Sequence, residues 1–319
     1  MAHFFIITAN LIWGGLPIYF YFFTDTSPLF MLAMQIVFTW LVLQLVFSGD
    51  PKVKPNNQGQ AQPKAQLGLK SWLTYIPSTC FIGANWGVYA LTVQSGHALE
   101  ASYAYLITPI LFAIVDYLLP ANRRNMTLLV LMLAALGLIA VDAVIEQVLP
   151  IAGIFIGACF TAYILWHRSQ SLEPITALKR ETTLLLPFAL LILFIVLEPN
   201  AHWEALSQLQ LWLLPLIGIL TCLPLGLFIL GSKQVSFSQI SLYQFISPLV
   251  GTLVAVELFQ ESFSLSKMLV YGGLIGILCL NLHLTRRQLA AQSTLAKKVL
   301  DNKGELMSHS AKVDGLSLK

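Results

Sequence analysis

The sequence predicts an all-α membrane protein with ten transmembrane helices, arranged as two inverted five-helix repeats. The first observation is composition: of 319 residues, 57% are hydrophobic and 10% are charged, whereas soluble domains are about 45–50% apolar and about 25% charged. The second is the length of the apolar runs, since a membrane-spanning helix takes about 20 residues. The third is a repeated motif, described below. Together they exclude a soluble globular protein and leave no room for a soluble catalytic domain.

Ten apolar runs, each bounded by polar residues or by Pro and Gly, give the predicted helices. They cover residues 3–22, 27–48, 72–94, 99–119, 126–146, 149–168, 182–198, 207–230, 236–257 and 265–285. Lipid offers the backbone no hydrogen-bond partners, so runs of this kind must be helices. They are too long and too regularly apolar for the strands of a membrane barrel.

The predicted domains follow from these runs and from two polar segments. Residues 1–146 form the first five-helix repeat, which includes a polar loop at 49–70, and residues 147–286 form the second. Residues 287–319 form a polar tail. Both polar segments are poor in apolar residues and are expected to be disordered on the cytoplasmic side.

The positions of Lys and Arg predict the orientation. With a cytoplasmic N-terminus, Lys267 is the only one of the 18 Lys and Arg residues that falls on the outer side. Positive residues concentrate in cytoplasmic loops, so both termini are predicted to be cytoplasmic. The net charge of +3 gives no reason to expect a nucleic-acid partner.

A duplicated motif relates the fourth and ninth predicted helices. Residues 102–109 read SYAYLITP and residues 241–248 read SLYQFISP, so that Pro109 and Pro248 are 139 positions apart. Five helices per half is an odd number, which inverts the second copy in the membrane, as in many secondary transporters. Both prolines are expected to kink their helices. A chance match is the alternative, although the equal halves and the charge pattern favour duplication.

Large polar and aromatic side chains inside the apolar runs are the candidate site residues. A buried amide must find partners or face a cavity, and the expected arrangement is a cavity near the middle of the membrane. Its predicted lining is Trp13, Gln35, Asn85, Trp86, Tyr105 and Gln244. The alternative is that these side chains make hydrogen bonds and close contacts between helices.

Acidic residues are predicted to lie toward helix ends. Glu100 and Asp116 are the candidates for coupling to an ion, with a helix N-terminus as the alternative partner of Glu100 and an ion-paired anchor as the alternative for Asp116. Asp142 is expected to be solvated, and Glu181 is expected to form an interfacial pair beside Lys179. Because no carboxylate is predicted at mid-membrane, facilitated diffusion or exchange is expected instead of proton-driven transport.

Enzyme and metal signatures are absent from the sequence. It contains no GxSxG, HExxH or Walker-type loop, and its 4 cysteines stand alone. We therefore expect no cofactor, no bound metal and no catalytic residues. A small-molecule substrate and the lipid bilayer are the expected partners.

The stretch NWGVYALTVQSGHALEASYAYLITPI, residues 85–110, resembles the most distinctive part of RarD-type proteins in the EamA branch of the drug/metabolite transporter superfamily. Other motifs match in the same order, at residues 12–14, 149–166, 181–194 and 243–248. The resemblance implies a ten-helix inverted-repeat permease of the inner membrane, in a family associated by name with chloramphenicol sensitivity.

The chain departs from the family pattern at one candidate site residue. Met34 and Gln35 stand where the family usually carries His-Arg, which bears on any substrate carboxylate that the Arg would bind. The predicted function is alternating-access transport of small amphipathic metabolites or drugs. A membrane sensor or assembly protein of transporter ancestry, or an intramembrane enzyme, are the alternatives.

Overall fold

The structure is a computed structural model that describes most of the apolar part of the chain. The described residues are 1–46, 72–118, 126–145, 147, 149–170, 173–196, 199–260, 263–277, 279–280 and 283–284. Within these ranges the chain is helical and has no strand. The predicted polar loop at 49–70 and the tail at 287–319 lie outside the described residues.

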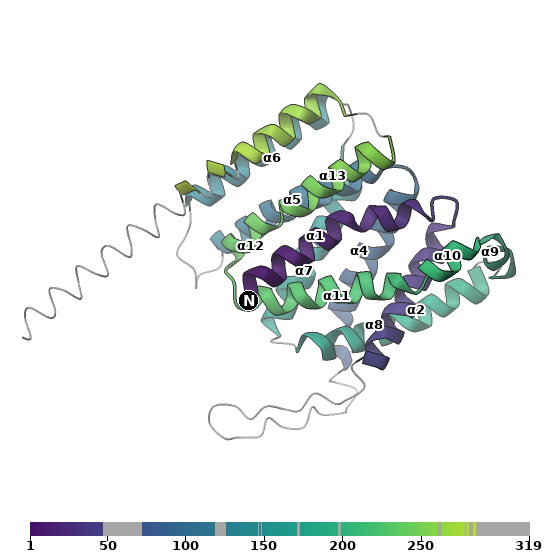
Figure 1. Cartoon of the computed structure of the whole chain (residues 1–319). Coiled ribbons are helices and arrows are strands. Elements are labelled where there is room, and N and C mark those ends of the chain that lie inside the picture. The colour runs from purple at the N-terminus through teal and green to yellow at the C-terminus, as the bar shows by residue number, and fades with distance from the viewer. Residues whose placement is uncertain are drawn as a thin grey trace, which may run out of the picture.

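The helices overlap the predicted apolar runs, except for the short α9, which lies between two of them (Figure 1). They are α1 Ala2–Tyr21, α2 Pro28–Val46, α4 Ile76–Gln94, α5 Ala98–Leu118, α6 Met126–Ile145, α7 Ile151–Ser169, α8 Pro174–Leu191, η1 Ile192–Val196, α9 Pro199–Ala205, α10 Gln208–Leu213, α11 Leu216–Ser232, α12 Phe237–Tyr243 and α13 Ile246–Leu258. A last apolar helix spans Leu265–Ile277.

The start of α8 corrects one predicted boundary. The helix begins at Pro174, whereas the apolar run predicted a start at 182. Glu173 caps it, because its carboxylate accepts hydrogen bonds from the backbone N–H groups of Ile175 and Thr176. A capping side chain followed by proline is a common helix start. The charged first turns of α8 hid this start from a hydropathy reading.

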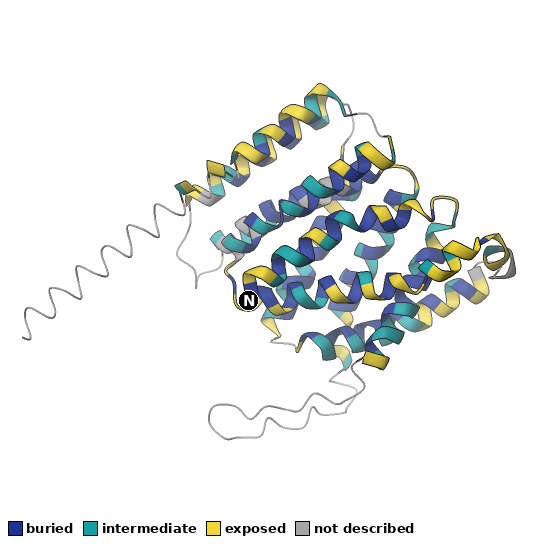
Figure 2. Ribbon diagram, in the orientation of Figure 1, coloured by how far each residue is buried: buried dark blue, intermediate teal, exposed yellow. Residues whose placement is uncertain are grey.

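The outer surface of the bundle is apolar, as a bilayer requires. Large hydrophobic side chains are exposed on it, among them Phe4 and Ile195, which are 64% and 73% exposed. Figure 2 shows exposed residues on the outward faces of the helices and buried residues between them. Among the described residues, four helical stretches are long and apolar enough to cross a membrane: Ala2–Tyr21, Pro28–Val46, Ile151–Ser169 and Gln208–Ser232, the last of which joins α10 and α11. An exposed apolar surface of this extent indicates an all-α membrane protein.

The helix α1 lies at the centre of the bundle, between α11 and α13 (Figure 1). Small residues allow this close packing. A Cβ atom on Gly14 would stand 2.8 Å from the backbone oxygen of Ser247 in α13. In the same way Gly218 of α11 meets the backbone oxygen of Phe38 in α2. Packing through glycine is typical of helices in membranes.

The two helices that carry the duplicated motif differ in continuity. α5 runs through Pro109 without interruption, whereas the second copy is divided between α12 and α13 at Gln244 and Phe245. The break lies four residues before Pro248, where the proline ring clashes with a carbonyl group and provides no N–H to bond it. α5 packs along both α12 and α13.

A candidate substrate cavity and a buried carboxylate

A small cavity lies inside the bundle, between helices of both predicted halves. It is lined by Trp13 and Leu16 of α1, Gln35 of α2, Ile82, Asn85, Trp86 and Tyr89 of α4, Thr108 of α5, Ile156 and Phe160 of α7, and Leu225 of α11. Its volume is about 40 Å³. One water molecule needs about 10–15 Å³ and drug-sized ligands occupy pockets of about 300–1,000 Å³. In this conformation the cavity therefore has space for a few water molecules.

Two amide side chains in the cavity wall also bind a second helix. Asn85 Nδ2 in α4 donates a hydrogen bond of 2.9 Å to the backbone oxygen of Ile156 in α7. Gln35 Nε2 in α2 donates one of 3.2 Å to Thr221 Oγ1 in α11. Each bond joins a helix of residues 1–146 to a helix of residues 147–286. The two amides thus line the cavity and connect helices at the same time.

Part of the apolar wall of the cavity is aromatic. Trp13 packs against Phe160 and Phe228, with ring centroids 5.3 Å and 5.2 Å apart, and the two phenylalanines are 5.3 Å from each other. Such tilted and edge-to-face pairs are favourable arrangements of aromatic rings. They bring α1, α7 and α11 together beside the cavity.

The structure brings four of the six predicted lining residues together, namely Trp13, Gln35, Asn85 and Trp86. Their role toward a substrate stays a prediction. Gln244 does not line this cavity. It is fully buried at the break between α12 and α13, where its side-chain oxygen and nitrogen have no hydrogen-bond partner among the described residues. The side chain of Tyr105 lies outside the described residues.

Of the two candidates for ion coupling, only the side chain of Glu100 is described. Glu100 Oε1 accepts a hydrogen bond of 3.4 Å from the backbone N–H of Ala152, in the first turn of α7. A carboxylate at a helix N-terminus is a stabilising arrangement, and here the helix is a neighbouring one. The side chain of Asp116 lies outside the described residues.

Two other acidic residues are more buried than the sequence predicts. Asp142 was expected to be solvated but is only 4% exposed. Glu181 was expected to pair with Lys179 at the membrane surface, and this interpretation is wrong because Glu181 is fully buried. Since α8 begins at Pro174, Glu181 falls in the middle of the helix and its side chain turns into the bundle.

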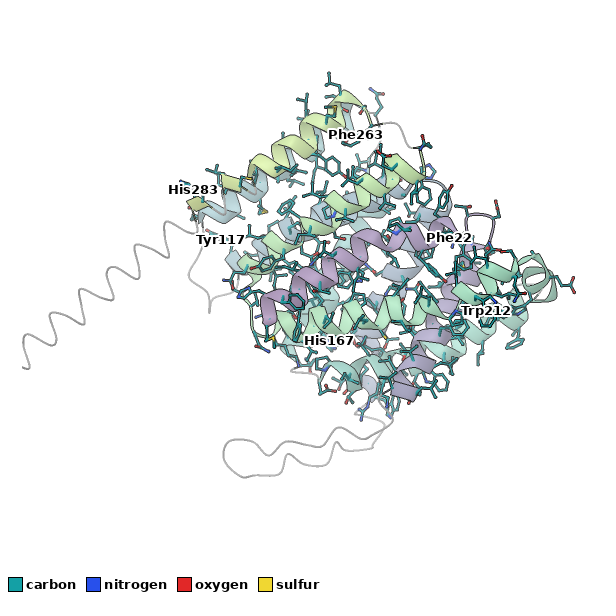
Figure 3. The ribbon with its side chains drawn as sticks, in the orientation of Figure 1. Phe22, Tyr117, His167, Trp212, Phe263 and His283 are labelled. Atoms are coloured by element: carbon teal, nitrogen blue, oxygen red, sulfur yellow. The ribbon has the colours of Figure 1, made fainter. Side chains whose placement is uncertain are left out.

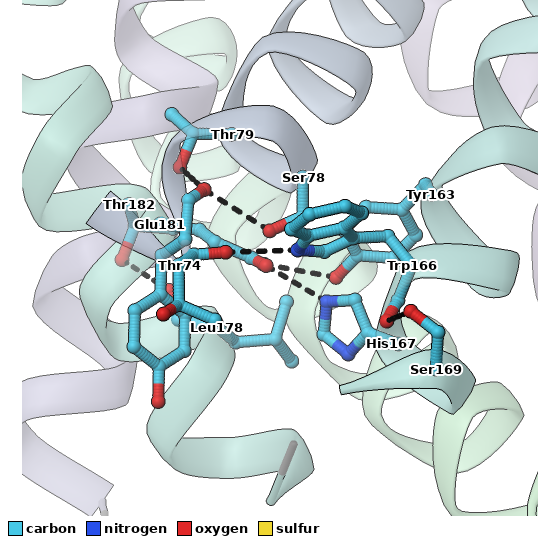
Figure 4. Close-up of polar contacts among 11 residues, drawn as sticks. Thr74, Ser78, Thr79, Tyr163, Trp166, His167, Ser169, Leu178, Glu181 and Thr182 are labelled. Carbon is cyan, nitrogen blue, oxygen red and sulfur yellow. Dashed lines mark hydrogen bonds and ion pairs between the residues drawn. The ribbon is translucent and has the colours of Figure 1, made fainter. Parts of the chain in front are cut away.

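Glu181 belongs to a polar cluster between α7 and α8 (Figure 4). Its Oε1 lies 2.7 Å from His167 Nε2, and its Oε2 accepts a hydrogen bond of 3.0 Å from the Tyr163 hydroxyl. The rings of Tyr163 and His167 are in contact, with centroids 4.3 Å apart. Figure 3 shows His167 within the bundle, whereas Trp212 lies at its margin. We call Glu181, His167 and Tyr163 the buried acid cluster.

Arg180, which precedes Glu181 in the chain, points in a different direction from Glu181. The Arg180 guanidinium lies over the rings of Trp72 and Tyr75, at 5.4 Å and 4.9 Å from the ring centroids. Cation–π contacts of this kind are common for arginine. Adjacent residues of a helix point in directions about 100° apart, which is why Arg180 and Glu181 meet different surroundings.

Comparison with known proteins agrees with the resemblance of residues 85–110, although no family model matches the sequence. An uncharacterized transporter of Vibrio cholerae is 27% identical over 83% of this chain and 86% of its own. The uncharacterized transporter YojE of Bacillus subtilis is 27% identical over 82% of this chain and 87% of its own. Protein RarD of Escherichia coli is 26% identical over 83% of this chain and 88% of its own.

A solved crystal structure has the same fold. Its TM-score is 0.62, with 16% identity over 90% of this chain and 98% of that chain. At this identity the likeness concerns the fold alone. The relatives named RarD confirm the resemblance by sequence.

Proposed function

We propose that the protein is a secondary transporter that moves small amphipathic compounds by alternating access. The observation that carries this proposal is the cavity whose wall combines Trp13 and Trp86 with the amides of Gln35 and Asn85. Aromatic faces suit the apolar part of a ligand and amides suit its polar groups. The relatives named as transporters add support.

We propose further that the chain consists of two inverted five-helix repeats, residues 1–146 and 147–286. The pattern of helix contacts supports this. In the proposed repeat, α7 is the counterpart of α1, and α4 and α5 are the counterparts of α11 and α13. α1 packs against α11 and α13, and α7 packs in the same way against α4 and α5. Gly14 of α1 and Gly153 of α7 are also both buried and differ by the same 139 positions as the duplicated motif. Inverted repeats of this kind enclose a site near the membrane midplane.

The two hydrogen bonds across the cavity suggest how the halves would separate. Gln35 and Asn85 each bind a helix of the second half in this closed conformation. A substrate that offers its own polar groups would replace those bonds, so that opening leaves no amide unpaired in the bilayer. A cavity of about 40 Å³ requires such an opening before a larger ligand enters.

Counterflow in proteoliposomes tests the proposed function. The full-length protein is reconstituted with a panel of unlabelled compounds inside, and uptake of the same compounds in labelled form is followed. The panel contains chloramphenicol and the aromatic amino acids as amphipathic probes. Faster exchange than in empty liposomes is expected for at least one probe. Equal rates for all probes would count against transport of this substrate class.

Cysteine labelling tests the proposed topology, in which the protein lies in the inner membrane with both termini in the cytoplasm. Single cysteines at Gly96 and His202 are expected to react with an impermeant thiol reagent added from the outer side. Gly96 lies in the short connection between α4 and α5, and His202 lies in the short helix α9. Labelling from the cytoplasmic side alone would contradict the orientation and the inverted repeat.

A further inference from the structure

The buried acid cluster places an ionisable pair inside a membrane protein, and the proposed transport mechanism does not use it. The side chains of Glu181 and His167 are each 1% exposed. Removing two ionisable groups from water is unfavourable, and well-packed apolar residues often replace such a pair without loss of stability. Ionisable residues inside membrane helices commonly mark proton or ion pathways. The pair therefore calls for a functional explanation.

The cluster is continuous with the cavity along one face of α7. Ile156, Phe160, Tyr163 and His167 follow one another at helical spacing on that face; the first two line the cavity and the last two contact Glu181. At 1.5 Å per residue, the Phe160 and His167 positions are about 10 Å apart along the helix. A change at the cluster is thus transmitted to the cavity wall through one rigid helix.

The cluster can hold one proton more or fewer. With Glu181 ionised, His167 Nε2 must carry the hydrogen that bonds Oε1, which leaves Nδ1 as the position for a second proton. Nδ1 is buried and has no hydrogen-bond partner among the described residues. Figure 4 shows it turned away from Glu181. A proton at Nδ1 converts a buried site of net charge −1 into a neutral ion pair without breaking either bond to Glu181.

The other titratable groups that interact with Glu181 come from two of the segments around it. They are Tyr163 on α7 and Tyr75 just before α4, and Tyr75 in turn interacts with Arg180 and Glu173. Tyr163 donates to Glu181, whereas Arg180 stacks on Tyr75. Histidine, unlike tyrosine and arginine, is a residue type that ordinarily changes charge near neutral pH.

We propose that the Glu181–His167 pair is a proton-binding site that couples transport through the cavity to the proton gradient. The proposal rests on the proposed transport function and replaces the expectation of facilitated diffusion or exchange. One proton from water on one side of the membrane binds at His167 Nδ1 and forms an imidazolium. The same proton later leaves to water on the other side, so that no further reactant is needed.

The position of the pair explains how a proton would act on the cavity. The bonds of Glu181 clamp α8 to α7, and α8 is joined to α2 by the Trp40 Nε1 hydrogen bond of 3.1 Å to Thr183 Oγ1. α2 also carries Gln35 in the cavity wall. A change of charge in the clamp therefore acts directly on α7 and, through α8, on α2, and both α7 and α2 line the cavity.

Infrared titration tests proton binding without any knowledge of the substrate. The full-length protein in lipid vesicles is titrated between about pH 5 and pH 8, and difference bands of imidazole and carboxyl groups are recorded. We expect an imidazole band that disappears in His167→Gln and a carboxylate band that shifts in Tyr163→Phe and is lost in Glu181→Gln. Glu204→Gln, at an exposed position of α9, is the matched control and should leave both bands unchanged. Identical imidazole bands in the wild-type protein and His167→Gln would overturn the proposal.

Transport under an imposed pH gradient tests the coupling. Proteoliposomes with clamped membrane potential receive the labelled probes that exchange in the wild-type protein. We expect accumulation of about tenfold per unit of pH gradient for one coupled proton, and an accumulation ratio near one in Glu181→Gln and His167→Gln, which still exchange labelled for unlabelled probe. Glu204→Gln should accumulate like the wild-type protein. Exchange that ignores the pH gradient would overturn the coupling alone, whereas absence of any exchange by the wild-type protein would reject the transport function and the coupling with it.

Discussion

The cavity and the buried acid cluster are two polar regions of the same bundle, and they differ in charge and in space. The cavity wall contains the neutral amides of Gln35 and Asn85 around a volume of about 40 Å³. The cluster contains an ionisable carboxyl group in direct contact with a histidine and a tyrosine. Neutral polar groups are tolerated next to a cavity that holds water, whereas a buried carboxylate needs fixed donors. The comparison separates a region suited to ligand binding from one suited to holding a proton.

The two regions also connect different parts of the chain. The cavity bonds from Gln35 and Asn85 join residues 1–146 to residues 147–286. The bonds of Glu181 lie within residues 147–286, between α7 and α8. The cavity is therefore sensitive to the relative position of the two proposed halves, and the cluster to the arrangement of helices within one of them.

The largest expected effect is the loss of stability when the buried acid cluster is broken. Glu181→Ala leaves the Tyr163 hydroxyl and the His167 Nε2 hydrogen buried without their acceptor, and each buried donor left without a partner costs about 1–3 kcal/mol. Thermal and denaturant unfolding of the purified protein in detergent measures the loss. Glu204→Ala on the exposed face of α9 is the control and should change stability by less than about 0.5 kcal/mol. Equal stability of the two variants would show that the cluster is not a buried, bonded pair.

A smaller loss is expected when only one bond of the cluster is removed. Tyr163→Phe keeps the ring contact with His167 but takes away the hydroxyl that donates to Glu181 Oε2. A hydrogen bond to a charged group contributes about 1.5–3 kcal/mol. Tyr21→Phe, at a position that is 43% exposed, is a matched removal of a hydroxyl. If both variants unfold at the same temperature, Tyr163 does not stabilise the carboxylate.

A substitution in the cavity is expected to have a large effect on transport and a small effect on stability, the opposite of a substitution in the buried acid cluster. Asn85→Ala removes a single neutral bond to Ile156, which contributes about 0.5–1.5 kcal/mol. Counterflow of the probes that the wild-type protein exchanges should nevertheless fall at least about tenfold, equivalent to about 1.4 kcal/mol of lost interaction. Ser78→Ala on the same helix, outside the cavity lining, is the control. Normal counterflow in Asn85→Ala would assign this amide to helix packing alone.

Much of the helical architecture could be predicted because lipid imposes it. Every apolar run of sufficient length had to be helical, and predicted limits such as 126–146 match α6, Met126–Ile145, closely. The start of α8 was missed because its first turns carry Lys179 and Arg180, which hydropathy assigns to a loop. Glu173 followed by Pro174 was the local signal for the true start.

The candidate site was predictable in part for the same physical reason. An amide such as Asn85 within an apolar run stands out, because it is unfavourable in lipid without a partner. Glu181 did not stand out, because it follows two basic residues and looked like part of a solvated segment. Its burial becomes apparent only from the direction in which its side chain leaves α8 and from its contact with His167, 14 residues earlier in the chain. Long-range pairing of this kind is not encoded in local hydropathy.

The smallest expected effect concerns Gln244, which belongs to neither region. Its amide is buried at the break between α12 and α13 with no hydrogen-bond partner among the described residues. Replacing a buried polar group that lacks a partner by an apolar one of similar shape is close to neutral or stabilising. Gln244→Met should therefore change the free energy of unfolding by no more than about 1 kcal/mol, measured beside Gln35→Met, which loses the bond to Thr221. A loss of transport in Gln244→Met at unchanged stability would extend the substrate path from the cavity to the helix break, whereas a marked loss of stability would mean that the amide is bonded in the membrane and that its role is structural.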